Sequence, residues 1–135
     1  MRNTMSVETI NFSAPAGKFT LEVSLTMLGQ DLQLIIWGGD KPHIGAVALA
    51  QPRASLKNPK NTSSTSSIIC IVGHKEDVVA KYMSEQLSAA LKTNVAVTAG
   101  MHWAVFNEED IVMVMESVNL LLDSIIKYLK SKGWP

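Results

Sequence analysis

The residues of this chain best suited to chemistry are its three histidines. His43, His74 and His102 each lie within two or three residues of a glycine, at the boundary of an apolar run. Such boundaries are where strands end, and α/β and α+β folds place ligand sites in the turns beyond strand ends. If those ends share one edge of a sheet, we expect the three imidazoles to converge there with Asp40, Lys41, Lys75 and Trp103.

Three kinds of chemistry are open to such a cluster. Three imidazoles can bind zinc with an open fourth position, although the short-spaced helical histidine pair of many zinc sites is absent. Histidine with aspartate can support general acid and base catalysis, but the sequence contains no nucleophile elbow, P-loop or dinucleotide fingerprint that would name a reaction.

The third possibility is a phosphorylated aromatic ligand. The helix amides near residues 73–75, the cations Lys41, Arg53 and Lys75 and the hydroxyl groups of residues 62–67 can hold a phosphate. Trp37 or Trp103 offers a face for a ring. A plain hairpin at residues 37–45, core tryptophans and a solvated serine loop would account for the same residues without a ligand.

The composition indicates an ordinary folded protein. The chain has 135 residues, 47% of them hydrophobic and 18% charged, which suits a single domain over residues 1–135 with its own core. Twelve basic residues balance twelve acidic ones, so no global charge attracts nucleic acid or an anionic membrane. With one cysteine, no signal-peptide core and no membrane-length apolar run, we expect a cytoplasmic protein with a disordered tail at residues 1–5.

Hydrophobic periodicity predicts strands in the first half of the chain. Apolar residues alternate strictly over 19–27, which predicts a strand with one buried face. The nearly continuous apolar run 32–37 predicts a strand covered on both faces. Further strands are expected at 6–13, at 44–50 before Pro52, and at 67–72 with Cys70 buried. Residues 53–67 are expected to form a long polar loop.

The second half of the chain predicts a helix, a strand and a second helix. The helix after residue 77 separates strands 67–72 and 95–99, a spacing typical of a crossover between two parallel neighbours. Asn107 and Asp110 are placed to cap the last helix, with Phe106 stapling onto Ile111. Apolar positions between 111 and 129 exceed one stripe, so this helix is either sunk in its own core or also covered by another subunit.

Three segments in order carry a family resemblance. Residues 36–48 (IWGGDKPHIGAVA), 73–77 (GHKED) and 98–103 (TAGMHW) resemble the prenylated-flavin chaperone-like family, typified by the small D subunit that accompanies gallate decarboxylase. The resemblance extends over residues 19–130. It implies an α+β fold like that of proteasome-assembly chaperones, which agrees with the element order β-β-β-β-β-α-β-α and a mixed, mainly antiparallel sheet.

The resemblance also implies a function. The chain would be a non-catalytic accessory protein that handles prenylated FMN for a prenyl-flavin-dependent decarboxylase, with that enzyme or the flavin prenyltransferase as partner and a homodimer as its own state. A small metal enzyme using His43, His74 and His102, or a purely structural homodimer, are the alternatives. The residues assigned to a candidate cofactor site are Trp37, Gly38, Gly39, Asp40, Lys41, His43, Gly73, His74, Lys75, Gly100, His102 and Trp103.

Overall fold

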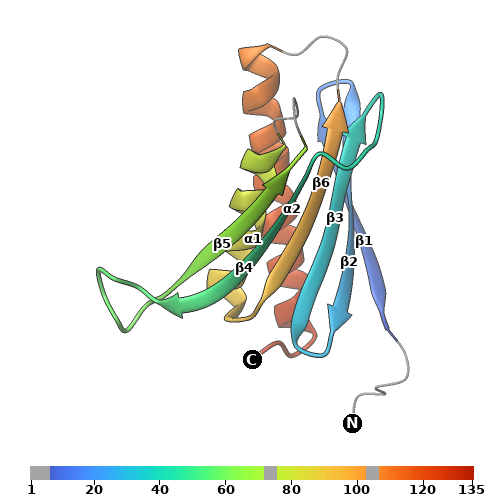
Figure 1. Cartoon of the computed structure of the whole chain (residues 1–135). Coiled ribbons are helices and arrows are strands. Elements are labelled where there is room, and N and C mark those ends of the chain that lie inside the picture. The colour runs from blue at the N-terminus through green and yellow to red at the C-terminus, as the bar shows by residue number, and fades with distance from the viewer. Residues whose placement is uncertain (1–6, 72–75, 103–106) are drawn as a thin grey trace.

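A computed structural model describes residues 7–71, 76–102 and 107–135. The described elements are β1 (Thr9–Ala16), β2 (Phe19–Leu28), β3 (Asp31–Gly39), β4 (Ala46–Ala54), β5 (Thr62–Cys70), α1 (Asp77–Leu91), β6 (Val95–His102) and α2 (Glu108–Ser131). They form one six-stranded sheet in the order β1-β2-β3-β6-β4-β5, with both helices behind it (Figure 1). The predicted α+β class and element order are confirmed.

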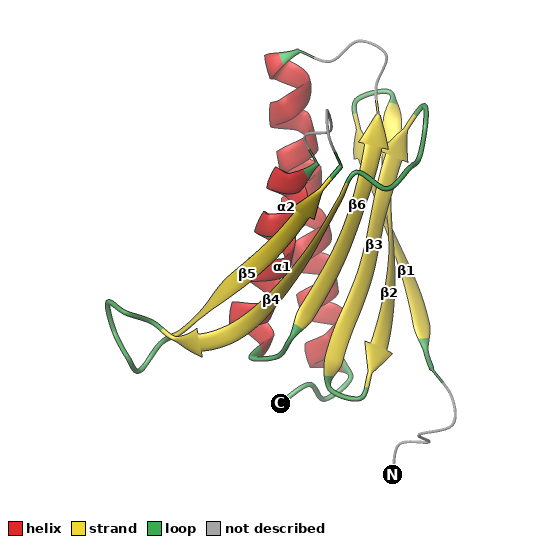
Figure 2. Ribbon diagram, viewed as in Figure 1, coloured by secondary structure: helices red, strands yellow, loops and turns green. Residues whose placement is uncertain are grey.

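The core lies between the sheet and the two helices. Leu21, Val23 and Leu25 of β2 point into it, as the alternation over 19–27 predicts, and all three are fully buried. Met83 and Leu87 of α1 and Leu121 and Ile125 of α2 close it from the other side. The opposite face of the sheet carries no helix in the described part of the chain and faces the viewer in Figure 2. The sheet therefore has one covered and one open face.

This open face corrects the expectation for β3. The run 32–37 is apolar except for Gln33, but Leu32, Leu34 and Ile36 are buried while Ile35 is exposed. Counting the described residues alone, strand β3 is thus covered on one face only.

The predicted pairing of strands 67–72 and 95–99 as parallel neighbours is also wrong. Strand β6 pairs in parallel with β3, Leu32 opposite Val95 through Gly39 opposite His102, and antiparallel with β4. Strand β5 pairs only with β4, at the edge of the sheet. The chain from β5 through α1 therefore passes beyond β4 and inserts β6 beside β3.

The prediction of a long loop at residues 53–67 is wrong, because more than half of these residues are in strands. Strand β4 runs through Pro52 to Ala54, and β5 begins at Thr62, which leaves only residues 55–61 as a loop. Beyond Ala50 strand β4 is no longer paired with β6, and proline is tolerated in a strand paired on one side. Strand β5 is a half-exposed edge strand rather than a buried one, and Cys70 is exposed.

The two helices begin at the same end of the sheet. Asn107 caps α2: its side chain accepts from the backbone N–H of Asp110, whose carboxylate accepts from the N–H of Asn107, so the predicted capping box is confirmed. Phe106 lies outside the described residues, and the predicted staple stays a prediction. Ile111, Val112 and Leu120 of α2 are exposed, so the helix is not sunk in its own core. No described helix has the length and hydropathy needed to cross a membrane.

Candidate functional site

Parallel pairing of β3 with β6 brings two of the predicted segments to one end of the sheet. Gly39 and His102 are opposite each other at the ends of these strands, and the backbone N–H of Asp40 donates to the carbonyl of His102 at 2.8 Å. The chain then crosses the end of β6, and Gly45 donates to the carbonyl of Ala99 at 2.9 Å before β4 begins. Backbone hydrogen bonds therefore connect both ends of the turn 40–45 to β6.

His43 lies in this turn and contacts a buried carboxylate. Its Nε2 lies 2.7 Å from Oε1 of Glu76, the residue before α1, and its Nδ1 lies 2.9 Å from the carbonyl oxygen of Lys41. The Glu76 side chain is only 7% exposed. Both ring nitrogens of His43 therefore face oxygen atoms, Nδ1 the carbonyl of Lys41 and Nε2 the carboxylate of Glu76, which fixes the orientation of the ring.

His102 forms a second histidine–carboxylate pair beside the first. Its Nδ1 lies 2.9 Å from Oδ1 of Asp40, and its side chain is 50% exposed. The His43 and His102 rings meet edge to face, with centroids 6.4 Å apart. Because Asp40 holds Nδ1, Nε2 of His102 is the nitrogen that a ligand would meet.

Glycines let the backbone close around these pairs. A Cβ on Gly100 would stand 1.3 Å from the carbonyl oxygen of His43, and one on Gly45 would stand 2.3 Å from Oε2 of Glu76. Gly39 has a φ of +80°, and a Cβ there would meet the carbonyl of His102 at 2.0 Å. Close approach of backbone atoms requires Gly39 and Gly100, and Gly45 leaves room for the Glu76 carboxylate, which explains why these glycines surround the histidines in the sequence.

The structure thus brings together three of the candidate groups and adds a fourth group to them. His43, His102 and Asp40 converge as predicted, and Glu76 joins them. Gly73, His74, Lys75 and Trp103 lie outside the described residues, so their part in the site stays a prediction. Within the described ranges no three histidine, cysteine or acidic side chains are arranged to hold a metal ion. The alternative zinc site needs His74 and also stays a prediction.

The remaining predicted residues are near the histidine pairs but not all in contact with them. Lys41 is exposed in the turn. Trp37 is half-buried on β3 and lies opposite Gly100 of β6, on the open face of the sheet. Gly38 packs against β2, where a Cβ would stand 2.7 Å from the Leu21 side chain.

The hydroxyl groups proposed to hold a phosphate do not reach this end of the sheet. Thr62 pairs with Ala54 at the far end of the β4–β5 hairpin, and Arg53 donates to Thr65 there at 2.6 Å. At about 3.3 Å per residue, Thr65 is roughly 16 Å along β5 from Cys70 at the histidine end. This prediction is wrong, because the stretch forms a strand that begins at the far end of the hairpin, so that its hydroxyl groups are spread along the strand and not gathered at the turn.

Sequence reasoning missed the role of Glu76. An acidic residue at the start of a helix interacts favourably with the helix dipole. This interaction already accounts for a glutamate at position 76, so its sequence position does not point to a buried partner. The signal in the sequence is Gly45. A glycine next to a strand often marks a place where another group approaches the backbone closely, and here that group is the Glu76 side chain.

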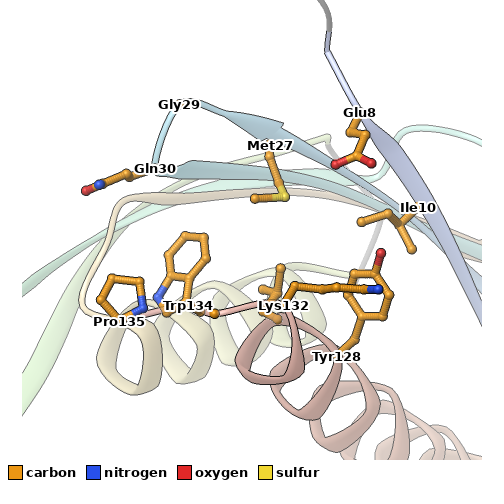
Figure 3. A pocket seen from close by; sticks show the side chains of 11 residues that line it. Glu8, Ile10, Met27, Gly29, Gln30, Tyr128, Lys132, Trp134 and Pro135 are labelled. Carbon is orange, nitrogen blue, oxygen red and sulfur yellow. The ribbon is translucent and has the colours of Figure 1, made fainter. Parts of the chain in front are cut away.

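A cavity lies at the opposite end of the molecule (Figure 3). It measures about 450 Å³ and lies between the start of β1, the turn from β2 to β3 and the end of α2. Ile10 and Met27 form one wall, and Tyr128, Lys132 and Trp134 form the other. Its size suits a small ligand, but it is separated from the histidine pairs by the length of the sheet.

Comparison with known proteins agrees with this architecture. A solved structure titled "Crystal Structure of a Novel Chaperone Complex for Yeast 20S Proteasome Assembly" superposes with a TM-score of 0.58 at 17% identity, covering 93% of this chain and 96% of that one. Protein LpdD of Lactiplantibacillus plantarum is 22% identical over 120 residues, which cover 89% of this chain and 85% of the relative. Residues 15–130 match the model of the prenylated flavin chaperone LpdD-like domain. The chain therefore belongs to the prenylated flavin chaperone LpdD-like family.

Proposed function

We propose that this protein binds prenylated FMN at the histidine end of its sheet and holds it for a prenyl-flavin-dependent decarboxylase. Membership in a chaperone family makes the chain an accessory protein rather than an enzyme. The observation that carries the proposal is the convergence of the pairs His43–Glu76 and His102–Asp40 at one accessible end, with ring centroids 6.4 Å apart.

The chemistry of the site supports a flavin. The isoalloxazine edge presents ring nitrogens and carbonyl oxygens, which histidine N–H groups can bind. Nε2 of His102 is presented at a half-exposed ring, and Lys41 supplies a flexible cation from the same turn. Trp37, beside the turn on the open face, is a ring against which a flavin can stack. Among the described residues neither pair is placed against a nucleophile, so their geometry favours holding a ligand over transforming it.

The surroundings of the site support contact with a partner protein. Ile44 in the turn, Val78 in the first turn of α1 and Ile111 in the first turn of α2 are each at least half exposed at this end of the molecule. Exposed apolar side chains gathered in one region are typical of protein interaction surfaces. We propose that the catalytic decarboxylase subunit, or the flavin prenyltransferase, docks here in the cytoplasm.

The test is an anaerobic titration of the protein with prenylated FMN, followed by flavin absorbance and calorimetry. His102→Ala removes the presented nitrogen, and we expect a loss of affinity of about 10- to 100-fold, the usual weight of a charge-assisted hydrogen bond. Lys132→Ala, in the cavity at the other end, is the matched control and should bind as the wild type does.

Two outcomes would overturn the proposal. If Lys132→Ala weakens binding and His102→Ala does not, the flavin occupies the cavity of Figure 3 instead. If the wild type neither binds prenylated FMN nor retains a decarboxylase subunit in a pull-down, the protein does not handle this cofactor.

A further inference from the structure

Strand β5 forms one edge of the sheet and, within the described residues, pairs only with β4 (Figure 1). Two hydrogen bonds that flank this pair show which way its backbone groups point. The N–H of Ile71 donates to the carbonyl of Gly45, and the N–H of Ser55 donates to the carbonyl of Asn61. Because hydrogen-bonded and non-bonded residues alternate in an antiparallel pair, the odd-numbered residues of β5 bond to β4. The even-numbered residues direct their N–H and C=O groups outward.

These outward backbone groups are open to a further strand. In the part of the chain that the structure describes, no residue forms a hydrogen bond with the backbone of Thr62, Ser64, Ser66 or Ile68 at the edge. The side chains of Ser64 and Ser66 point to α1 instead, where Glu85 accepts a hydrogen bond from each. Strand β5 is therefore held in place from one face while its edge stays exposed.

Edge strands usually carry charged residues, proline or bulges that prevent pairing with another chain, and β5 has none of the three. Its nine residues read TSSTSSIIC, and its register with β4 is continuous from Cys70 to Thr62. The opposite edge of the sheet differs. Pro15 of β1 has no N–H to offer, and its carbonyl accepts from the Ser117 hydroxyl of α2. One edge is thus protected and the other is not.

We propose that β5 accepts an extended segment of a partner protein as a seventh strand of the sheet. The even-numbered residues of β5 supply the backbone donors and acceptors for this pairing. The proposal does not depend on flavin binding.

The charge of the hairpin formed by β4 and β5 indicates the chemistry of that segment. Residues 46–71 contain three basic residues and no acidic one. All three, Arg53, Lys57 and Lys60, are exposed near the loop 55–61, which projects from the body of the molecule in Figure 1. Acidic side chains at the end of the segment that passes this loop would complement the three cations.

The other end of β5 is apolar. Ile69 is 75% exposed and Ile71 is 49% exposed. Antiparallel pairing is the more stable arrangement, and an antiparallel seventh strand runs from this end towards the loop 55–61. The partner segment is therefore expected to begin with apolar, β-branched residues and to end with acidic ones.

The backbone of β5 favours a polypeptide over a nucleic acid. Three cations attract phosphate groups as well as carboxylates, but phosphate oxygens only accept hydrogen bonds. The edge of β5 presents donors and acceptors in alternation, and another strand is the structure that matches both.

The experiment uses a capped peptide, IVTVTSTEDE, as the probe for such a segment. It is titrated into the full chain, and amide hydrogen exchange is followed by NMR. We expect exchange at Ser64, Ser66 and Ile68 to be fast in the free chain and to slow by at least about 10-fold when the peptide binds. The amides of Thr65 and Ser67 bond to β4 and should exchange slowly from the start.

A matched pair of variants separates the backbone from the side chain. Ser66→Pro removes one outward N–H but no hydrogen bond to β4, and we expect it to weaken peptide binding by at least about 10-fold. Ser66→Ala loses the same hydroxyl group but keeps the N–H, and it should bind as the wild type does. Circular dichroism and thermal unfolding check that both variants are folded.

Modified peptides test the pairing without changing the protein. N-methylation of one alternate set of peptide amides should abolish binding, because these amides face β5, and N-methylation of the other set should not. The peptide IVTVTSTKNK, in which basic residues replace acidic ones, should bind at least about 10-fold more weakly than IVTVTSTEDE.

Three outcomes would overturn the proposal. The first is unchanged exchange at Ser64, Ser66 and Ile68 with millimolar peptide. The second is binding that tolerates both sets of N-methylation or that is equally tight for IVTVTSTKNK. The third is an oligomer of the wild type that Ser66→Pro, but not Ser66→Ala, converts to single chains in light scattering, since a second copy would then occupy the edge.

Discussion

Gly100 determines how closely the histidine-bearing turn approaches strand β6. The position that a Cβ would take is 1.3 Å from the backbone carbonyl oxygen of His43, and a backbone atom cannot rotate away as a side-chain tip can. Any side chain at residue 100 must therefore displace the turn 40–45, and with it both histidine–carboxylate pairs.

We expect Gly100→Ala to destabilise the protein by about 3 kcal/mol, the upper end for overpacking, because the clash is with backbone. Thr98→Ala, on the same strand and face, is the control and should cost less than about 1 kcal/mol. Urea unfolding measures both. Equal stability of Gly100→Ala and the wild type would mean that the turn does not pack as described.

Glu76 is a buried carboxylate whose role depends on His43. Removing it leaves Nε2 of His43 without its oxygen partner in a mostly buried place. Glu76→Ala should therefore cost roughly 3 kcal/mol, the upper end for leaving a buried polar group without its partner, and Glu76→Gln about 1 kcal/mol because the amide can still form a hydrogen bond.

A double-mutant cycle with His43→Ala separates this pair from general effects of substitution. In the His43→Ala background, Glu76→Ala should cost clearly less than it does in the wild type. If its cost is unchanged, the two side chains do not interact energetically. Glu108→Gln, an exposed glutamate at the start of α2, is the control and should be nearly neutral.

At the scale of elements, hydroxyl groups fasten the edge strand β5 to helix α1. Ser64 donates to the carbonyl of Glu85 and Ser66 donates to its carboxylate, each at 2.8 Å, while Lys81 pairs with the same carboxylate. This explains how a strand with so few apolar residues is held on the sheet. It also explains why the stretch resembles a loop in sequence, since hydroxyl groups replace the usual apolar contacts.

These contacts predict a dependence of stability on pH. Burial raises the pKa of Glu85, but the hydrogen bonds from Lys81 and Ser66 and the charges of Lys81 and Arg53 outweigh it, and the pKa falls below the ordinary 4.5. A carboxylate with a lowered pKa in the folded state stabilises that state above the unfolded pKa, and this contribution is lost as pH falls through the folded value.

The expected result is a loss of stability in acid that depends on Glu85. Between pH 7 and pH 3, the unfolding free energy of Glu85→Gln should decrease less than that of the wild type, with the difference appearing below about pH 4.5. Glu116→Gln, exposed on α2, should follow the wild type. Parallel pH profiles for wild type and Glu85→Gln would contradict the assignment.

At the scale of the whole molecule, the candidate site and the closure of the core lie at opposite ends. The histidine pairs lie where both helices begin, while the last residues of the chain fold back at the other end. There Trp134 Nε1 donates to the carbonyl of Leu91 at 3.0 Å, which ties the end of α2 to the end of α1 and forms a wall of the cavity.

We expect Trp134→Phe to lower stability by about 1 kcal/mol, the usual net value of one hydrogen bond, while leaving the apolar wall in place. Affinity for prenylated FMN should not change, because the change is remote from the histidine pairs. Thermal unfolding and the flavin titration test both parts. A loss of flavin binding in this variant would move the site to the cavity.

The sequence by itself determined the features that depend on local pattern. The alternation over 19–27, the capping box at Asn107 and the glycine-bracketed histidine motifs identified the buried face of β2, the start of α2 and two of the converging histidines. Each depends on neighbours within a few residues, where backbone geometry relates sequence spacing directly to position.

Only the tertiary structure decided which strands are neighbours and which faces are covered. The place of β6 between β3 and β4 brings His102 to Asp40, residues 62 positions apart, and the start of α1 brings Glu76 to His43. An apolar run such as 32–37 has the same pattern whether its second face meets a helix, solvent or a second copy. What covers a face is set by long-range packing, and no local spacing encodes it.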